Sequence, residues 1–139
     1  MIHFVGAGPG AVDLITVRGQ KLLETADQII YAGSLVNPQL LACAKKDCRI
    51  LDSAGMTLEA VIAAMEEGEG QGWMTVRLHT GDPSVYGAIR EQMDILSQKG
   101  LAYDVVPGVS SFCAAAASLQ AEYTLPGISQ SVIITRMEG

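Results

Sequence analysis

"GAGPGAVD" (residues 6–13) lies between an apolar run, IHFV, and a helical pattern. Gly6, Gly8 and Ala11 fit the G-x-G-x-x-G/A fingerprint of dinucleotide-binding loops. Two further features of the sequence argue against that interpretation. The next β-rich run ends IIYAGS, without the acidic residue that holds the ribose hydroxyls, and Pro9 removes a backbone N–H from the loop that would bind a pyrophosphate. The glycines therefore have another role.

Apolar, β-rich runs alternate with helical patterns along the rest of the chain. The expected strands are residues 2–6, 28–32, 49–51, 73–79, 103–106 and 131–135. The expected helices cover residues 15–26, a short stretch after Pro38, and residues 57–67, 85–99 and 110–119, with a turn at EEGEGQG (66–72). This alternation predicts an α/β domain with an open, mostly parallel sheet and helices on both faces.

Glycine, proline and serine gather in the segments that directly follow four of these strands. They are GAGPG (6–10), AGSL (32–35), TGDPSVYG (80–87) and PGVSS (107–111). The carboxyl ends of parallel strands line the ligand crevice of an open α/β sheet, so the pattern predicts a ligand site built from at least three of these loops. The alternative is that tight strand-to-helix turns simply favour glycine.

Composition limits the class of protein. A chain of 139 residues with 49% hydrophobic residues fits one globular domain. The net charge of −6 argues against a nucleic-acid partner. No apolar run approaches the ~20 residues of a membrane span, and no signal peptide is evident at the amino end. Three cysteines without a C-x-x-C pair predict reduced thiols, a cytoplasmic protein and no metal site.

Two of these loops hold polar side chains suited to ligand binding. Asp82, between Gly81 and Pro83, suits ligand hydroxyls or a cation, but it equally suits an Asx turn or the cap of the next helix. Ser110 and Ser111 can offer hydroxyl and N–H donors to a ligand, or can simply cap the helix that they begin.

The aromatic candidates are equally open to two interpretations. Tyr31 and Tyr86 stand at loop edges, where their rings would either flank a flat ligand or pack into the core with a solvated hydroxyl. His79, at the end of a strand, is expected to be a packing residue rather than a base, and His3 is expected to be structural.

Taken together, these motifs resemble those of the tetrapyrrole methylase family. The resemblance rests on three segments in family order: VGAGPGAVDLIT (5–16), TGDPSVYGAI (80–89) and VPGVSSF (106–112). Within the family, YAGSLV (31–36) and LPGISQSVIITRMEG (125–139) resemble the members that methylate carbon 11 of precorrin-4 or cobalt-precorrin-4. TGDPSVYGAI (80–89) is more similar to the cobalt-dependent branch.

The resemblance implies a two-domain, homodimeric enzyme of cobalamin biosynthesis that binds S-adenosylmethionine between its domains and releases S-adenosylhomocysteine. Residues 1–135 would form the amino-terminal domain, and residues 136–139 would begin the linker to a second domain absent from this chain. The fragment alone is expected to be inactive. The alternatives are a non-catalytic nucleotide-binding or assembly domain, and a family member that methylates another ring position.

The resemblance also implies roles for individual residues. Those expected to contact the cofactor are Pro9, Thr80, Gly81, Asp82, Val85, Ser110 and Ser111. Asp82 is the candidate catalytic residue. Those expected to contact the tetrapyrrole are Gly8, Tyr31, Tyr86 and Arg136. Because the tetrapyrrole bears many carboxylates, some of its other neighbours are expected among Arg18, Lys21, Arg90 and Arg136.

Overall fold

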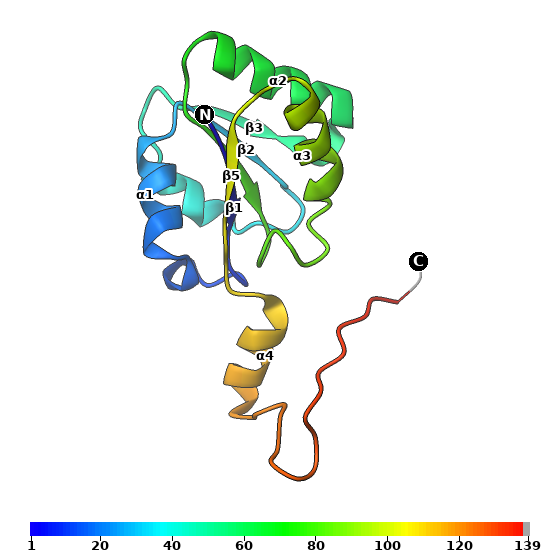
Figure 1. The fold of residues 1–139 in the computed structure, drawn as a ribbon. Helices are drawn as coiled ribbons and strands as arrows, with labels where there is room; N and C mark the ends of the chain where they lie inside the picture. Colours follow the sequence, from blue (N-terminus) through cyan, green and yellow to red (C-terminus); the bar gives the residue numbers. More distant parts are fainter. Residues whose placement is uncertain (138–139) are drawn as a thin grey trace.

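Five parallel strands form one sheet in the computed structural model, which describes residues 1–137 (Figure 1). The spatial order is β3-β2-β4-β1-β5, so β4 is central, β2 and β1 lie on either side of it, and β3 and β5 are the outer strands. All neighbouring strands pair in parallel, as the sequence predicts. The strands are β1 (Ile2–Gly6), β2 (Gln28–Tyr31), β3 (Arg49–Asp52), β4 (Thr75–His79) and β5 (Tyr103–Val106).

Helices cover both faces of this sheet. α1 (Val17–Thr25) and the 3₁₀ helix η2 (Pro38–Cys43) lie on one face, and α2 (Leu58–Gly70) and α3 (Ile89–Gln98) lie on the other (Figure 1). Side chains alternate between the faces along each strand. In β1 and β2, for example, one core contains Val5 and Ile29, while the other contains Phe4 and Ile30. The predicted fold class is confirmed.

The turn expected at residues 66–72 is wrong for most of its length, because α2 continues to Gly70. Gly68 is buried in the last turns of this helix, where an added Cβ would lie 2.7 Å from Thr75 Oγ1. The absence of a side chain at Gly68 therefore lets α2 approach β4 closely, and this glycine does not end the helix. The turn is confined to the residues after the helix and includes Gly72, whose φ is +71°.

The helix expected from residue 85 begins four residues later, at Ile89. Tyr86 and Ala88 have φ values of +55° and +51°, in the left-handed region. A right-handed helix cannot run through such residues, so the apolar spacing that includes Val85 overextends the prediction. Val85 instead belongs to a turn, in which its N–H donates to the Asp82 carbonyl at 3.1 Å.

The strand expected at residues 131–135 is also wrong, because the structure assigns no strand to these residues. After β5 the chain forms α4 (Ser111–Leu119), which contains no buried residue and projects away from the sheet, and the segment that follows turns back in an extended form (Figure 1). A strand pattern needs a neighbouring sheet edge for its hydrogen bonds, and none lies beside this segment within residues 1–137. Of the predicted linker at 136–139, residues 138 and 139 lie outside the described residues.

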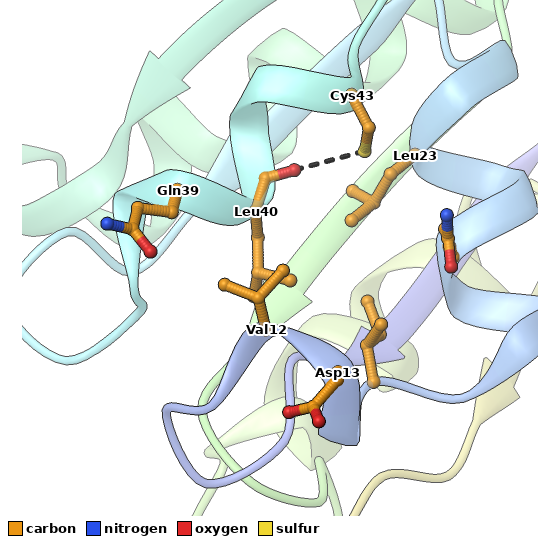
Figure 2. Close-up of a pocket in the computed structure, with 8 residues that line it drawn as sticks. Val12, Asp13, Leu23, Gln39, Leu40 and Cys43 are labelled. Carbon is orange, nitrogen blue, oxygen red and sulfur yellow. Dashed lines mark hydrogen bonds between the residues drawn. The ribbon is translucent and has the colours of Figure 1, made fainter.

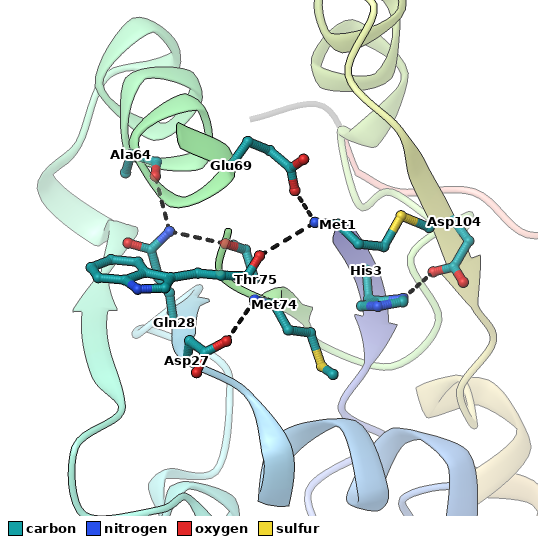
Figure 3. Close-up of polar contacts among 10 residues, drawn as sticks. Met1, His3, Asp27, Gln28, Ala64, Glu69, Met74, Thr75 and Asp104 are labelled. Carbon is teal, nitrogen blue, oxygen red and sulfur yellow. Dashed lines mark hydrogen bonds and ion pairs between the residues drawn. The ribbon is translucent and has the colours of Figure 1, made fainter. Parts of the chain in front are cut away.

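Polar contacts close the edge of the sheet at which the strands begin (Figure 3). Asp27 accepts the Met74 N–H at 2.8 Å and pairs with Lys45. Gln28 Nε2 donates to the Ala64 carbonyl at 2.9 Å. His3 Nδ1 lies 2.6 Å from Asp104 Oδ1, in agreement with its expected structural role. No helix within residues 1–137 is long and apolar enough to cross a membrane.

Candidate functional site

Three glycine-containing loops meet at the opposite edge, where the strands end. Gly8 and Gly81 form an antiparallel bridge, with N···O distances of 3.2 and 2.8 Å. Gly6, Gly81 and Gly108 pack backbone against backbone, and a Cβ on Gly6 would lie 2.6 Å from both Gly108 Cα and the Gly81 carbonyl oxygen. The loops that begin after β1, β4 and β5 therefore interlock, and side chains at these glycine positions would separate them.

Asp82 cross-links two of these loops. Its Oδ2 accepts the Gly108 N–H at 2.9 Å, and its Oδ1 accepts the Ser84 N–H at 2.9 Å and the Ser84 hydroxyl. This is the Asx turn that the sequence left open, and it does not cap α3, which begins seven residues later. Burial alone would raise the pKa of Asp82, but the hydrogen bonds from Ser84 and Gly108 outweigh it and hold the pKa below its usual value. The carboxylate is ionised at neutral pH.

A cavity of about 540 Å³ opens beside this junction. It brings together most of the predicted site residues. Those that line it are Thr80, Gly81, Asp82, Val85, Tyr86, Ser110, Ser111 and Arg136. Three predicted residues do not line it. Gly8 is one residue of the bridge to Gly81, Pro9 follows it, and Tyr31 packs against the core on the α1 side of the sheet.

The end of the described chain forms part of the cavity wall. Ile134, Thr135 and Arg136 line the cavity, and the Arg136 guanidinium carbon lies 5.7 Å from the centre of the Tyr86 ring. This is a cation–π contact at an exposed aromatic side chain. Of the basic residues expected near the tetrapyrrole, only Arg136 lines the cavity, whereas Arg90 pairs with Asp94 on the exposed side of α3.

The floor of the cavity has unused hydrogen-bonding capacity. Thr80 Oγ1 and His79 Nε2 are buried and lack a partner among residues 1–137. Ser110 is buried, yet its side chain makes no capping hydrogen bond to α4, contrary to the capping interpretation. Because buried polar groups in native proteins are nearly always paired, these atoms are available to a ligand, to water or to another part of the protein.

Three buried polar residues that line the cavity were not among the predicted site residues. The first, His79, stacks on Phe4 with ring centres 6.1 Å apart, which agrees with the packing interpretation, but it also lines the cavity. Burial, with a smaller contribution from the charge of Arg77, lowers the pKa of His79 to about 3, so the ring is neutral.

The other two are Arg77, in the middle of β4, and Gln92, on α3; both are buried and line the cavity. The sequence holds a signal for Arg77, because a charged residue stands in the otherwise apolar run TVRL of a central strand.

A second cavity, of about 480 Å³, shares no lining residue with the first (Figure 2). It lies between η1 (Val12–Leu14), α1 and η2, and aliphatic side chains such as Leu23 and Leu40 line much of it. Its one thiol, Cys43, donates to the Leu40 carbonyl at 3.0 Å, and burial raises the pKa of that thiol. None of the predicted site residues line this cavity. Within residues 1–137, no cluster of His, Cys, Asp and Glu that could hold a metal ion is found.

Comparison with known proteins agrees with this arrangement. The family model described as Tetrapyrrole (Corrin/Porphyrin) Methylases matches residues 1–139. The chain belongs to the tetrapyrrole methylase family. A relative from Methanocaldococcus jannaschii, a cobalt-precorrin-4 C(11)-methyltransferase, is 58% identical over 138 residues, which are 99% of this chain and 53% of the relative.

Solved structures of the tetrapyrrole methylase family show the same fold. The X-ray structure of a cobalt precorrin-4 methyltransferase is 50% identical and superposes with a TM-score of 0.96, covering 99% of this chain and 58% of the other. A uroporphyrin-III C-methyltransferase from Thermus thermophilus, complexed with S-adenosylhomocysteine, is 29% identical with a TM-score of 0.78, covering 94% of this chain and 52% of the other. The chain thus spans about half the length of these proteins.

Proposed function

We propose that this chain is the amino-terminal domain of an S-adenosylmethionine-dependent methyltransferase that acts at carbon 11 of precorrin-4 or cobalt-precorrin-4 in cobalamin biosynthesis. In this proposal residues 1–135 form the domain, residues 136–139 begin the linker, and the full-length protein adds a second domain. The observation that carries it is the cavity at the carboxyl ends of the strands, lined by the family's motif residues and left with unpaired polar groups.

The cavity fits the cofactor in the chemistry of its donors. The adenosine and amino-acid parts of S-adenosylmethionine carry hydroxyl, amine and carboxylate groups. The Thr80 and Ser110 hydroxyls offer partners to such groups, and Gly81, without a side chain, lets the ligand approach the backbone. Ser111 and Val85 complete the wall on either side. Pro9 and Gly8 would contribute from the adjoining loop, outside the cavity lining of this domain.

The bound cofactor supplies an electrophilic methyl group, so the protein's main task is to hold the two reactants in line. Asp82 suits this task as a positioning residue, because both carboxylate oxygens are engaged in fixing the 80–87 and 107–111 loops. Its lowered pKa makes it unsuited to donate a proton at neutral pH. Arg136 and Tyr86, at the cavity mouth, are placed to meet the carboxylates and the ring of a tetrapyrrole.

The test is methyl transfer by the full-length protein. The protein is incubated with S-adenosylmethionine carrying a ¹³C-methyl group and with either precorrin-4 or cobalt-precorrin-4, and the labelled carbon is located by NMR. Label at carbon 11 supports the proposal, and the faster of the two substrates identifies the metal state. Label at another ring carbon would assign the protein to another branch, and no transfer to either substrate would favour a binding or assembly domain.

Quaternary structure and location are part of the same proposal. By its resemblance to the family, the full-length protein would be a cytoplasmic homodimer. Sedimentation equilibrium measures the first point directly, and a monomer at micromolar concentration would contradict it.

A further inference from the structure

Arg77 carries a buried positive charge without a carboxylate partner. The residue is 7% exposed and lies in β4, at the centre of the sheet. Its Nε donates to Gln92 Oε1 at 3.3 Å, and its Nη1 donates to the Ile30 carbonyl at 3.2 Å. Among residues 1–137, no acidic side chain lies within ion-pair distance of it. A buried charge without a counter-ion is unfavourable by several kcal/mol, so this guanidinium lacks a partner that its position requires.

The guanidinium does not lose its charge to relieve this cost. Burial lowers the pKa of Arg77 to about 10, which leaves it protonated at neutral pH. Of the other arginines, Arg49 pairs with Glu67 and Arg90 pairs with Asp94, whereas Arg18 and Arg136 have no ion pair but are exposed to solvent. Arg77 differs from all of them because it is buried and has no carboxylate partner within residues 1–137.

Arg77 also faces the cavity together with two unpaired neighbours. Residues 77 and 79 point to the same face of β4, and both line the cavity with Thr80. His79 Nε2 and Thr80 Oγ1 are the unpartnered buried atoms at this end of the strand. A cation, a neutral imidazole and a hydroxyl thus converge on one wall, and a single anionic group with several lone pairs would satisfy them together.

We propose that Arg77, supported by Thr80 and His79, forms a carboxylate-binding subsite on the floor of this cavity. The subsite rests on the proposed function, which supplies two sources of a carboxylate. One is the amino-acid end of the cofactor, and the other is an acidic side chain of the tetrapyrrole. Gln92 positions the guanidinium, because its amide oxygen accepts from Arg77 while its amide nitrogen donates to the Ala88 carbonyl at 3.1 Å.

The competing explanation is purely structural. In that explanation, the arginine only ties β2 and β4 to the start of α3, through the contacts that lead from Ile30 by way of Arg77 and Gln92 to Ala88. A structural arginine would affect every ligand of the cavity alike. A carboxylate subsite discriminates between ligands that carry a carboxylate there and ligands that do not.

The test is calorimetric titration of the full-length protein and its Arg77→Met variant with three probes. They are S-adenosylhomocysteine, its decarboxylated analogue, and uroporphyrin III as a polycarboxylate tetrapyrrole. If the cofactor supplies the carboxylate, the variant binds S-adenosylhomocysteine about tenfold more weakly and the decarboxylated analogue as well as the wild type does. If the tetrapyrrole supplies it, uroporphyrin III alone is weakened by about tenfold. Arg49→Met, which removes an arginine that pairs with Glu67 at the other edge, should change none of the three affinities.

Equal weakening of S-adenosylhomocysteine and its decarboxylated analogue, or no weakening of any probe, would overturn the subsite. A wild-type protein that binds none of the probes would overturn both this proposal and the proposed function, so the two failures are distinguishable. Should Arg77→Met not fold, the Arg77 Nε–H resonance of the unmodified protein decides. We expect S-adenosylhomocysteine or uroporphyrin III to shift it and the decarboxylated analogue to leave it in place, whereas no shift with either of the first two overturns the subsite.

Discussion

Polar groups find their partners differently at the edge where the strands begin and at the edge where the strands end. At the edge where the strands begin, polar groups pair with one another: Asp27 with the Met74 N–H, and His3 with Asp104 (Figure 3). Asp27 also pairs with Lys45. At the edge where they end, bare glycine backbones interlock and several polar side chains remain without partners. Most polar groups at the first edge satisfy one another, whereas several at the second edge border a cavity in which a ligand can satisfy them.

Gln28 is an exception to this difference between the two edges. Gln28 Oε1, near the strand starts, is also buried and unpaired among residues 1–137. Its amide nitrogen, however, is fully engaged by Ala64 and Thr75, and Gln28 does not line either cavity. Unpaired polar atoms therefore indicate a ligand site only where they border a space that a ligand can enter.

The largest effect is expected from adding a side chain at the glycine junction. In Gly108→Ala the new Cβ would lie 2.8 Å from Gly6 Cα and closer still to the Gly81 carbonyl oxygen. Backbone must move to accommodate it, so we expect a loss of about 3 kcal/mol in the free energy of unfolding, measured with urea, together with loss of S-adenosylhomocysteine binding. Gly55→Ala is the control, because nothing lies within 4 Å of its added Cβ. Equal stability of the two variants would show that the junction is not tight.

Asp82 and Asp27 can be compared directly, because they lie at opposite ends of the strands and make similar hydrogen bonds. Each accepts a backbone N–H from another segment, Asp82 from Gly108 and Asp27 from Met74. Asp82→Ala should lower methyl transfer by about a hundredfold, because the loops that position the reactants lose their tie. Asp27→Ala should reduce the urea midpoint and leave S-adenosylhomocysteine affinity unchanged. Near-normal turnover in Asp82→Ala would remove that residue from the site.

The same aspartates imply a pH dependence of stability. Hydrogen bonds with Lys45 and Met74 lower the pKa of Asp27, and the pKa of Asp82 is lowered as well. Their stabilising contributions are therefore present above the ordinary carboxyl pKa of about 4 and are lost as the pH falls through the lowered folded-state values.

His79 adds a separate pH dependence at higher pH. Its pKa of about 3 in the folded chain lies below the unfolded value of 6.5, so the unfolded chain binds a proton between these values and the folded chain does not. Stability should fall by about 2 kcal/mol from pH 7 to pH 5 through this group alone. Urea unfolding of the wild type and of His79→Gln at both pH values measures the difference. An identical pH dependence in the two proteins would mean that the ring is not held neutral.

The smallest effect is expected from two glycines of α2. An added Cβ at Gly68 would lie 2.7 Å from Thr75 Oγ1, whereas nothing lies within 4 Å of one at Gly70. Gly68→Ala should destabilise the chain by about 1–2 kcal/mol, and Gly70→Ala should be neutral or stabilise it by up to about 1 kcal/mol. Thermal unfolding ranks the two variants, and the reverse order would show that α2 does not press on β4 at Gly68.

The sequence predicted most of the fold because its signals are local. The expected bounds of β1 and β5 agree with the structure, since each is a short run that glycine or proline closes. The predictions failed where a distant contact decides the outcome. Gly68 is inside a helix because it touches Thr75, and residues 131–135 have a strand pattern but no sheet edge beside them within residues 1–137.

The sequence predicted part of the candidate site because the signals of its loops are local. Loop chemistry indicated Asp82, Ser110 and Ser111, and the family resemblance added Thr80 and Gly81; all five line the cavity. Periodicity alone does not show that a buried strand arginine lacks a carboxylate partner, because that depends on which side chains surround it in space. The role of each residue towards a ligand stays a prediction.

The most direct test of the central claim is calorimetric titration of the full-length protein and of Asp82→Ala with S-adenosylhomocysteine, with NAD as the comparison ligand. We expect the wild type to bind S-adenosylhomocysteine and not NAD, and Asp82→Ala to bind S-adenosylhomocysteine more weakly. Binding of NAD in its place, or undiminished binding by Asp82→Ala, would contradict the claim that the edge where the strands end is a methyltransferase cofactor site.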